Sequence, residues 1–274
     1  MSNLPSDELY AYNDRSNDFV EEYKYFKWRQ EKAKVFCERF PEGIKFENKT
    51  VLDLGCGNGA LSFYALEKGA KSVVGIDVNN TIIDFSKYLL EQHFSQYKNR
   101  ISFLKANICD LESVKFDIII CQATFEHILD PYSCLKGIEL SLKQEGKAYI
   151  GFADLYNSPW GDHKRIKAPF SNIFPWAHIS FKQEWLIQNY NKNNQNDPIN
   201  SIHDLGMNGF SFSQYLDLFN STDLKIIYFK VNNSKNPLVH IINIFRLIKG
   251  FRELLSMNIY ITLKKENHEI QNKL

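Results

Sequence analysis

The feature that most constrains the fold is a short apolar run that ends in three glycines at alternate positions. Residues 51–59 read VLDLGCGNG, and a helical pattern starts at Ala60. Glycine permits a positive φ angle, and it lets a ligand lie against the backbone where a Cβ would otherwise intervene. The start of the following helix supplies unpaired N–H groups. The segment therefore predicts a strand, a ligand-binding turn and a helix.

The pattern around this unit predicts an α/β sheet. Apolar runs indicate strands at residues 50–54, 72–77, 101–105, 116–121 and 148–152, the last after a turn at Gly146. Helical periodicity is found over residues 17–40, 60–68, 81–94 and 131–142. Alternating strands and helices favour parallel strands joined by right-handed crossovers. Such a doubly wound sheet binds its ligand beyond the carboxyl ends of the strands.

The regular alternation stops after residue 152. Residues 153–222 are too long for an ordinary crossover, and their polar run at 189–200 favours a mobile loop. Strand signals return at 224–231 and 258–263, on either side of an apolar, helix-like segment at 238–255. We divide the chain into an N-terminal helical segment or lid (1–44), a cofactor-binding core (45–152), a substrate-side insertion (153–222) and C-terminal strands that complete the sheet (223–274).

Composition excludes several classes of protein. The 274 residues include 33 basic and 32 acidic ones, so no global positive field favours nucleic acid as a partner. The five cysteines are odd in number and form no CxxC pair, which argues against a disulfide framework and predicts reduced thiols in the cytoplasm. The sequence shows no signal peptide, no membrane-spanning run and no recognisable metal-ligand cluster.

Two carboxylates near the glycine turn bear on the class of cofactor. Gly55, Gly57 and Ala60 also satisfy the dinucleotide fingerprint, so an NAD(P)-dependent oxidoreductase is the alternative. Asp53 would lie close to the pyrophosphate of a dinucleotide, which is unfavourable, whereas it suits the ammonium group of a methionine-like ligand. Asp77 ends the second strand and can accept hydrogen bonds from ribose hydroxyls in either class.

The ordered set of motifs resembles the class I S-adenosylmethionine (SAM) dependent methyltransferases. The resemblance rests on VLDLGCGNG at 51–59, GIDVN at 75–79, FDIIICQATFEHILDP at 116–131 and the Gly146 turn. It implies a Rossmann-like, doubly wound, seven-stranded and mostly parallel sheet that ends in an antiparallel hairpin. It also implies SAM as the cofactor and S-adenosylhomocysteine (SAH) as its product.

The resemblance further implies which residues contact the cofactor. They are Asp53, Gly55, Cys56, Gly57, Gly59, Asp77, Val78, Asn107, Ile108 and Gln122. The glycine loop would hold the methionine part, Asp77 the ribose, and Asn107 with Ile108 the adenine. Asn107 stands where family members often have Asp, and its side-chain oxygen can still pair with the adenine amino group. Glu126 and His127 belong to a recurrent loop motif and are expected to shape this pocket.

The expected acceptor side holds two clusters of aromatic and histidine residues, at 160–163 and 175–178. Histidine is the usual general base near neutral pH. We therefore hypothesise that His163 or His178 accepts the proton of an acceptor hydroxyl, and that Asp162 can orient a histidine. The alternative is that both histidines are hydrogen-bonded structural residues. Arg165 is a candidate contact for an anionic substrate group, or part of a solvated face.

The sequence thus predicts a SAM-dependent methyltransferase for a small-molecule acceptor. A hydroxyl of a sugar or other biosynthetic intermediate is preferred, with N-methylation of a small molecule or a protein, and a SAM-binding subunit without catalysis, as alternatives. Nucleic-acid amino methyltransferases usually carry an Asn/Asp-Pro-Pro-aromatic motif after the fourth strand, where residues 121–124 read CQAT. The N-terminal segment carries aromatic residues such as Tyr10, Tyr12 and Tyr25. The resemblance implies that this segment covers the cofactor pocket, and packing is favoured over substrate contact for its aromatic side chains. The sequence predicts no oligomeric state.

Overall fold

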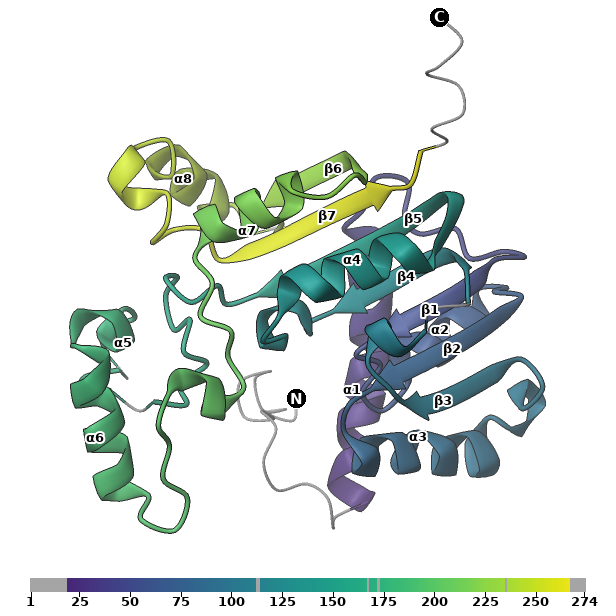
Figure 1. Ribbon diagram of the computed structural model, residues 1–274, viewed down its shortest axis with the longest axis horizontal. Helices are drawn as coiled ribbons and strands as arrows, with labels where there is room; N and C mark the ends of the chain where they lie inside the picture. The colour runs from purple at the N-terminus through teal and green to yellow at the C-terminus, as the bar shows by residue number, and fades with distance from the viewer. Residues whose placement is uncertain (1–18, 112–113, 167, 172, 235, 267–274) are drawn as a thin grey trace, which may run out of the picture.

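A seven-stranded sheet forms the centre of the computed structural model, which describes residues 19–111, 114–166, 168–171, 173–234 and 236–266 (Figure 1). The strands are β1 (Thr50–Leu54), β2 (Ser72–Asp77), β3 (Ile101–Lys105), β4 (Phe116–Gln122), β5 (Leu142–Ala153), β6 (Lys225–Val231) and β7 (Asn258–Lys264). Their order is β3-β2-β1-β4-β5-β7-β6. Strand β7 runs antiparallel to β5 and β6, and the other pairs are parallel. The predicted doubly wound, mostly parallel sheet is confirmed.

This strand order also bears on the dehydrogenase alternative. A dinucleotide-binding sheet has the order 3-2-1-4-5-6 with a parallel sixth strand. Here β7 inserts antiparallel between β5 and β6. The order reverses between β1 and β4, so the loops that follow these two strands lie side by side at the carboxyl edge of the sheet.

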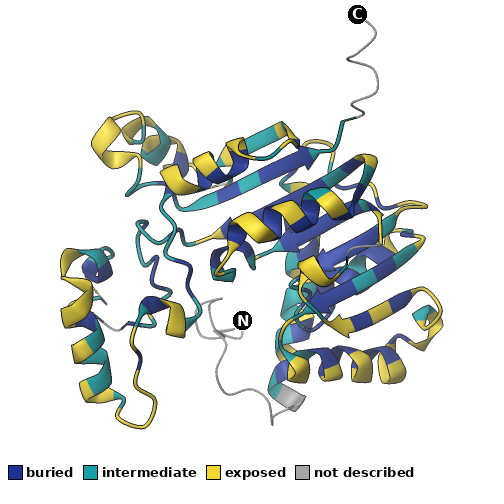
Figure 2. Ribbon diagram, in the orientation of Figure 1, coloured by how far each residue is buried: buried dark blue, intermediate teal, exposed yellow. Residues whose placement is uncertain are grey.

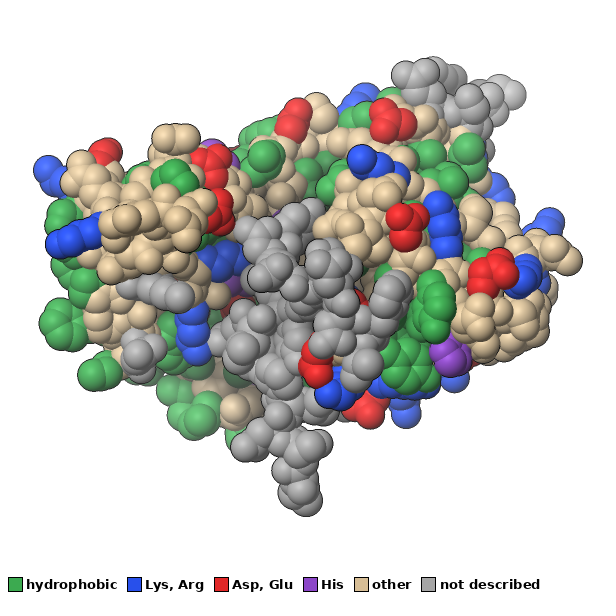
Figure 3. Space-filling view, turned by 90° about the horizontal axis from the view of Figure 1, so that it is seen from below, with side chains coloured by type: hydrophobic (Ala, Val, Ile, Leu, Met, Phe, Trp, Pro, Cys, Tyr) green, Lys and Arg blue, Asp and Glu red, His purple; other side chains and the backbone are tan. Residues whose placement is uncertain are grey.

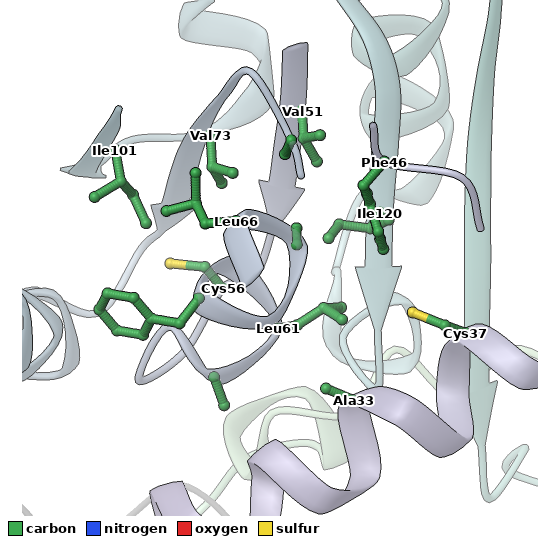
Figure 4. Close-up of a cluster of buried hydrophobic side chains, with 14 of the residues drawn as sticks. Ala33, Cys37, Phe46, Val51, Cys56, Leu61, Leu66, Val73, Ile101 and Ile120 are labelled. Atoms are coloured by element: carbon green, nitrogen blue, oxygen red, sulfur yellow. The ribbon is translucent and has the colours of Figure 1, made fainter. Parts of the chain in front are cut away.

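Helices cover both faces of the sheet. The α-helices are α1 (Phe19–Glu38), α2 (Ala60–Glu67), α3 (Asn80–His93), α4 (Pro131–Ser141), α5 (Ala177–Ser180), α6 (Gln183–Asn193), α7 (Phe212–Asn220) and α8 (Leu238–Phe245). One core cluster joins α1, α2 and α3 to the sheet, and Figure 4 shows Ala33, Leu61 and Ile120 within it. A second cluster joins α4 and α7 to the opposite face. The strands are accordingly the most buried part of the chain in Figure 2.

The N-terminal helix forms because its apolar residues recur at helical spacing. Phe26, Ala33, Phe36 and Phe40 are all buried, and they pack against the first core cluster. The ring of Phe26 meets that of Phe63 edge-on, with the ring centroids 5.9 Å apart. The predicted N-terminal helix is confirmed over Phe19–Glu38, while residues 17 and 18, and with them Tyr10 and Tyr12, lie outside the described residues.

Three expectations about local structure were wrong. Strand β5 begins at Leu142, not after Gly146, because Leu142 already pairs with Phe116 across an irregular register. The polar run at 189–200 is helical up to Asn193, since it continues α6, whose Leu186 is buried. The apolar segment at 238–255 is helical only over Leu238–Phe245, and a short 3-10 turn follows at Lys249–Phe251.

The segment after β5 contains two different kinds of structure. A small core of Ile166, Ala168, Ala177, Leu186, Ile202 and Met207 lies apart from the two sheet clusters. Helix α7 instead packs on the sheet, because Phe212 and Tyr215 belong to the second sheet cluster. The division of the chain at residues 153 and 222 stays a prediction. Among the described ranges, no helix is long and apolar enough to cross a membrane.

Candidate functional site

A cavity of about 1620 Å³ opens at the carboxyl edge of the sheet. The loops after β1, β2, β3, β4 and β5 contribute to its wall, α1 contributes Glu22, Tyr25 and Arg29, and the segment after β5 contributes His163 and Arg165. Typical ligand pockets measure roughly 300–1,000 Å³. The cavity therefore has room for a nucleoside-sized cofactor and a second molecule beside it.

Nine of the ten predicted cofactor contacts line this cavity. They are Asp53, Gly55, Cys56, Gly57, Asp77, Val78, Asn107, Ile108 and Gln122. The side-chain Oε1 of Gln122 is buried, and it has no hydrogen-bond partner among the described residues. The same holds for Nδ2 of Asn58, which also lines the wall. Buried polar atoms are normally paired, so these two atoms are suited to meet a polar ligand.

Asp53 is a fully buried carboxylate at the end of β1. Its Oδ2 accepts a hydrogen bond of 2.6 Å from the Ser62 hydroxyl at the start of α2. Burial raises the pKa of Asp53 to about 7, although the Ser62 hydrogen bond and the positive charge of Arg29 both lower it. Burial thus disfavours the ionised form of this carboxylate. A cationic ligand would stabilise that form, so the site is well suited to bind one.

The glycines of the turn differ in what surrounds them. A Cβ on Gly57 would meet no atom of the described protein within 4 Å, and this residue lines the cavity. A Cβ on Gly59 would instead come within 2.7 Å of the Phe103 ring. Gly59 does not line the cavity; it lies at the start of α2 with a φ of 79°. The backbone at Gly57 is thus open to the cavity, whereas Gly59 is packed against the Phe103 ring.

Asp77 and Asn107 present polar atoms from neighbouring strand ends. The Asp77 carboxylate accepts hydrogen bonds from the backbone N–H groups of Gly57 (3.0 Å) and Asn79 (2.9 Å), and burial raises its pKa. These bonds fix the carboxylate against the glycine loop. Asn107 caps a short 3-10 turn, and its Oδ1 accepts from the N–H of Cys109 at 3.3 Å.

Glu126 is buried, His127 and His163 are partly buried, and the three form a cluster of titratable side chains in the wall of the cavity. The rings of His127 and His163 lie 5.2 Å apart between centroids. Burial, with the nearby charge of Arg165, lowers the pKa of His127 to about 4. Burial, His127 and Arg165 lower the pKa of His163 to about 3. Both imidazoles are therefore neutral at physiological pH.

The pKa of Glu126 is shifted upward, whereas the pKa values of the two histidines are lowered. Burial raises its pKa to about 8, and its Oε2 has no hydrogen-bond partner within the part of the chain that the structure describes. Its Oε1 lies 4.0 Å from Nε2 of His127. Because Nδ1 of His127 is 2.6 Å from the Gly206 carbonyl, this nitrogen carries the proton and Nε2 is the acceptor.

His178 lies elsewhere. It is 2% exposed and does not line the cavity. Its Nε2 is 2.6 Å from the Tyr156 carbonyl, and its Nδ1 is 3.7 Å from Oδ1 of Asp162. Asp162 thus lies near His178 but beyond hydrogen-bond distance, and its carboxylate accepts hydrogen bonds from the backbone N–H groups of Lys164 and Ile166. The orienting role of Asp162 stays a prediction. The two candidate bases are not brought together at one site.

Replacing His178 with Ala should lower the free energy of unfolding. The change removes a buried hydrogen bond and leaves the Tyr156 carbonyl without it, which typically costs ~1–3 kcal/mol. Urea unfolding of the variant, followed by fluorescence, measures this cost, and SAH titration of the folded variant should match the wild type. A stability equal to that of the wild type would contradict the structural role.

Sequence reasoning missed the contribution of Arg29. This residue lies in the middle of α1 and lines the cavity, and its charge acts on both Asp53 and Glu126. Only the position of α1 over the carboxyl edge reveals it, since a single Arg in a charged helix carries no motif. In the described ranges, no group of three His, Cys, Asp or Glu residues has the arrangement of a metal site.

Comparison with known proteins places this geometry in a family. The family model described as "Methyltransferase domain" matches residues 45–195. A ubiquinone biosynthesis O-methyltransferase of Coxiella burnetii is 30% identical over 148 residues, which cover 54% of this chain and 62% of that relative. The chain thus spans less than two thirds of the length of that relative.

Solved structures share the fold at low identity. A SAM-dependent methyltransferase from Mesorhizobium loti matches with a TM-score of 0.52 and 14% identity, over 84% of this chain and 96% of that one. A geranyl diphosphate methyltransferase in complex with SAM matches with a TM-score of 0.54 and 11% identity, over 86% of this chain and 85% of that one. At such identities the likeness concerns the fold.

Proposed function

The chain belongs to the SAM-dependent methyltransferases of the methyltransferase domain family, and on that premise we propose that it methylates a hydroxyl of a small-molecule acceptor. One observation carries the proposal. The cavity continues from the cofactor loops past β4 to a neutral histidine, His163, which comes from the segment after β5. A cytoplasmic location and a sugar or another biosynthetic intermediate as acceptor go with this proposal.

The cofactor side of the cavity supports binding of SAM. We assign the ammonium group of its methionine part to the Asp53 carboxylate, which is buried and close to Arg29. We assign the ribose to Asp77, and the backbone approach to Gly57, where no Cβ intervenes. Asn58 and Gln122, whose side-chain amides each hold one unpaired atom, line the same cavity. When bound, SAM supplies an electrophilic methyl group on a positively charged sulfur.

The acceptor side provides a proton acceptor, His163, in the wall of the cavity. His163 would accept the proton of the acceptor hydroxyl as the oxygen takes the methyl group that SAM supplies, and SAH would be the other product. This imidazole is hydrogen-bonded to the backbone of Asp154 through one nitrogen, so the other nitrogen takes the proton. The low pKa keeps that nitrogen unprotonated throughout the physiological range but makes it a weak base, so alignment of the acceptor contributes most of the rate.

His163→Ala should lower kcat by roughly 10²-fold, the lower end of the usual contribution of a general base, because an imidazole with a pKa of about 3 is a weak base. SAH affinity should stay unchanged, because His163 lies at the acceptor end of the cavity. The pH profile of kcat for the wild type should show no acid limb near pH 6.5, the ordinary pKa of histidine, since the His163 pKa is about 3. A modest loss of rate in His163→Ala, with SAH affinity intact, would remove the general base from this mechanism.

The acceptor class is tested with SAM that carries a deuterated methyl group. The protein is incubated with this SAM and with a pool of small metabolites, and products are identified by mass and by the chemical shift of the new methyl group. We expect deuterated methyl ethers. Methylamines as the products would favour the N-methyltransferase alternative, and label found only in added protein would assign a protein acceptor.

A further inference from the structure

Helix α8 and the turn that follows it expose a dense group of large apolar side chains. These are Leu238, Ile241, Ile244, Phe245, Leu247, Ile248 and Phe251, which we call the α8 surface; their exposed fractions range from 45% to 85%. None of the seven lines the cavity. Figure 2 shows α8 as one of the most exposed elements of the fold. Large contiguous apolar patches are rare on soluble monomeric proteins and mark interaction sites.

The apolar side of α8 points away from the protein, unlike that of a helix that packs on a core. Leu238, Ile241 and Phe245 follow the i, i+3, i+7 spacing of one helix face, which a globular protein normally turns inward. Here Val239 faces the protein and is 8% exposed, while the three apolar residues of the stripe are at least half exposed. Asn243 also faces inward, because its Oδ1 accepts a hydrogen bond from Asn232. Because Val239 and Asn243 occupy the inward side of α8, its apolar face points outward.

The charged residues within the stretch that forms the α8 surface are all positive. Arg246, Lys249 and Arg252 lie within residues 236–252, a stretch that contains no Asp or Glu. The guanidinium groups of Arg246 and Arg252 lie 5.2 and 5.1 Å from the centroid of the Phe212 ring, which holds both beside the surface. The next acidic residue, Glu253, accepts hydrogen bonds from the N–H groups of Phe212 and Ser213.

We propose that the α8 surface binds the anionic lipid surface of a membrane. A short amphipathic helix with apolar residues on one side and Lys or Arg at its edge lies in the plane of the headgroups, and it is attracted by anionic lipid. The eight residues of α8 are too few to span a bilayer. A second copy of this chain fits less well, because a twofold contact would bring the same cations against each other. Elsewhere on the molecule the charges are mixed, as on the face in Figure 3.

Vesicle flotation with the full chain tests this proposal. Vesicles of phosphatidylcholine containing phosphatidylglycerol should carry the protein, and pure phosphatidylcholine vesicles should carry at least tenfold less. The double change Ile244→Ser with Leu247→Ser should lower the bound fraction at least tenfold, and Lys249→Glu should lower it severalfold. Leu140→Ser on α4 and Lys45→Glu, both exposed, are the matched controls and should bind like the wild type. SAH titration verifies that every variant is folded.

Three results would overturn the proposal. One is the absence of flotation with anionic vesicles. Another is equal flotation of the double variant and the wild type. The third is a concentration-dependent dimer, seen by sedimentation, that the double variant abolishes while vesicles bind neither protein; it would assign the α8 surface to a second copy of the chain.

Discussion

Asp53→Asn should weaken SAH binding by roughly 10- to 100-fold, because a charge-assisted contact contributes about 1.5–3 kcal/mol. The substitution keeps the size of the side chain and its bond from the Ser62 hydroxyl, and it removes only the negative charge. Asparagine cannot compensate the ammonium group of the methionine part in a buried site. Isothermal titration of both proteins with SAH at pH 8 measures the difference.

The same carboxylate should make binding depend on pH. The pKa of Asp53 is raised to about 7, and only its ionised form attracts the ammonium group. SAH affinity should therefore be greatest above pH 7 and should fall by up to tenfold per pH unit as the pH drops through this value. The loss should level off once the pH is below the pKa of Asp53 in the complex, which the bound cation lowers.

Two comparisons separate this effect from general acid sensitivity. Asp53→Asn should lose the pH dependence of binding between pH 5 and 8, whereas Asp217→Asn, a change of an exposed carboxylate on α7, should retain it. If Asp53→Asn binds SAH as tightly as the wild type at pH 8, the ammonium group is bound elsewhere. A wild-type affinity that stays constant from pH 8 to pH 5 would contradict the raised pKa.

Gly57→Ala should mainly weaken SAH binding, whereas Gly59→Ala should mainly lower the free energy of unfolding. Both residues have a positive φ angle, so alanine costs ~1–2 kcal/mol at either position. The Cβ at residue 57 would enter open space in the cavity wall, so SAH affinity should fall roughly 30-fold or more with little further loss of stability. The Cβ at residue 59 would collide with the Phe103 ring, so unfolding should become easier by a further ~1–3 kcal/mol.

Urea unfolding and SAH titration of the two variants provide the two readouts. The double variant Gly59→Ala with Phe103→Leu is a useful control, since the smaller side chain gives the new methyl group room and should recover part of the lost stability relative to Phe103→Leu alone. A Gly57→Ala variant that binds SAH normally would show that the cofactor does not lie against this loop.

Strand positions near the glycine turn could be predicted closely from sequence. The bounds of β1, β2 and β3 are those expected, because each is a short apolar run closed by glycine or polar residues. The start of β5 could not be predicted. Its first residues, Leu142–Glu145, alternate in no clear way, and only the pairing of Leu142 with Phe116 makes them a strand. Helix α6 was missed because a single buried residue, Leu186, anchors it.

Some residues of the site could likewise be placed from sequence, and others could not. Residues at the carboxyl end of a parallel strand reach that edge of the sheet by topology alone, so Asp53, Asp77 and Gln122 could be placed from sequence. His163 and His178 belong to an irregular segment with no periodicity, so nothing local distinguishes the histidine that lines the cavity from the one bonded to Tyr156. The place of Arg29 in the site could not be predicted from sequence, because it depends on how α1 packs across the edge of the sheet.

A crystal structure of the full chain with SAH tests the central claim most directly. We expect the amino-acid part of SAH to contact Asp53 and Gly57, and the sulfur to face the part of the cavity that His163 lines. Density for SAH in another part of the cavity, or a sulfur that points away from His163, would contradict the proposed division of the cavity into a cofactor side and an acceptor side.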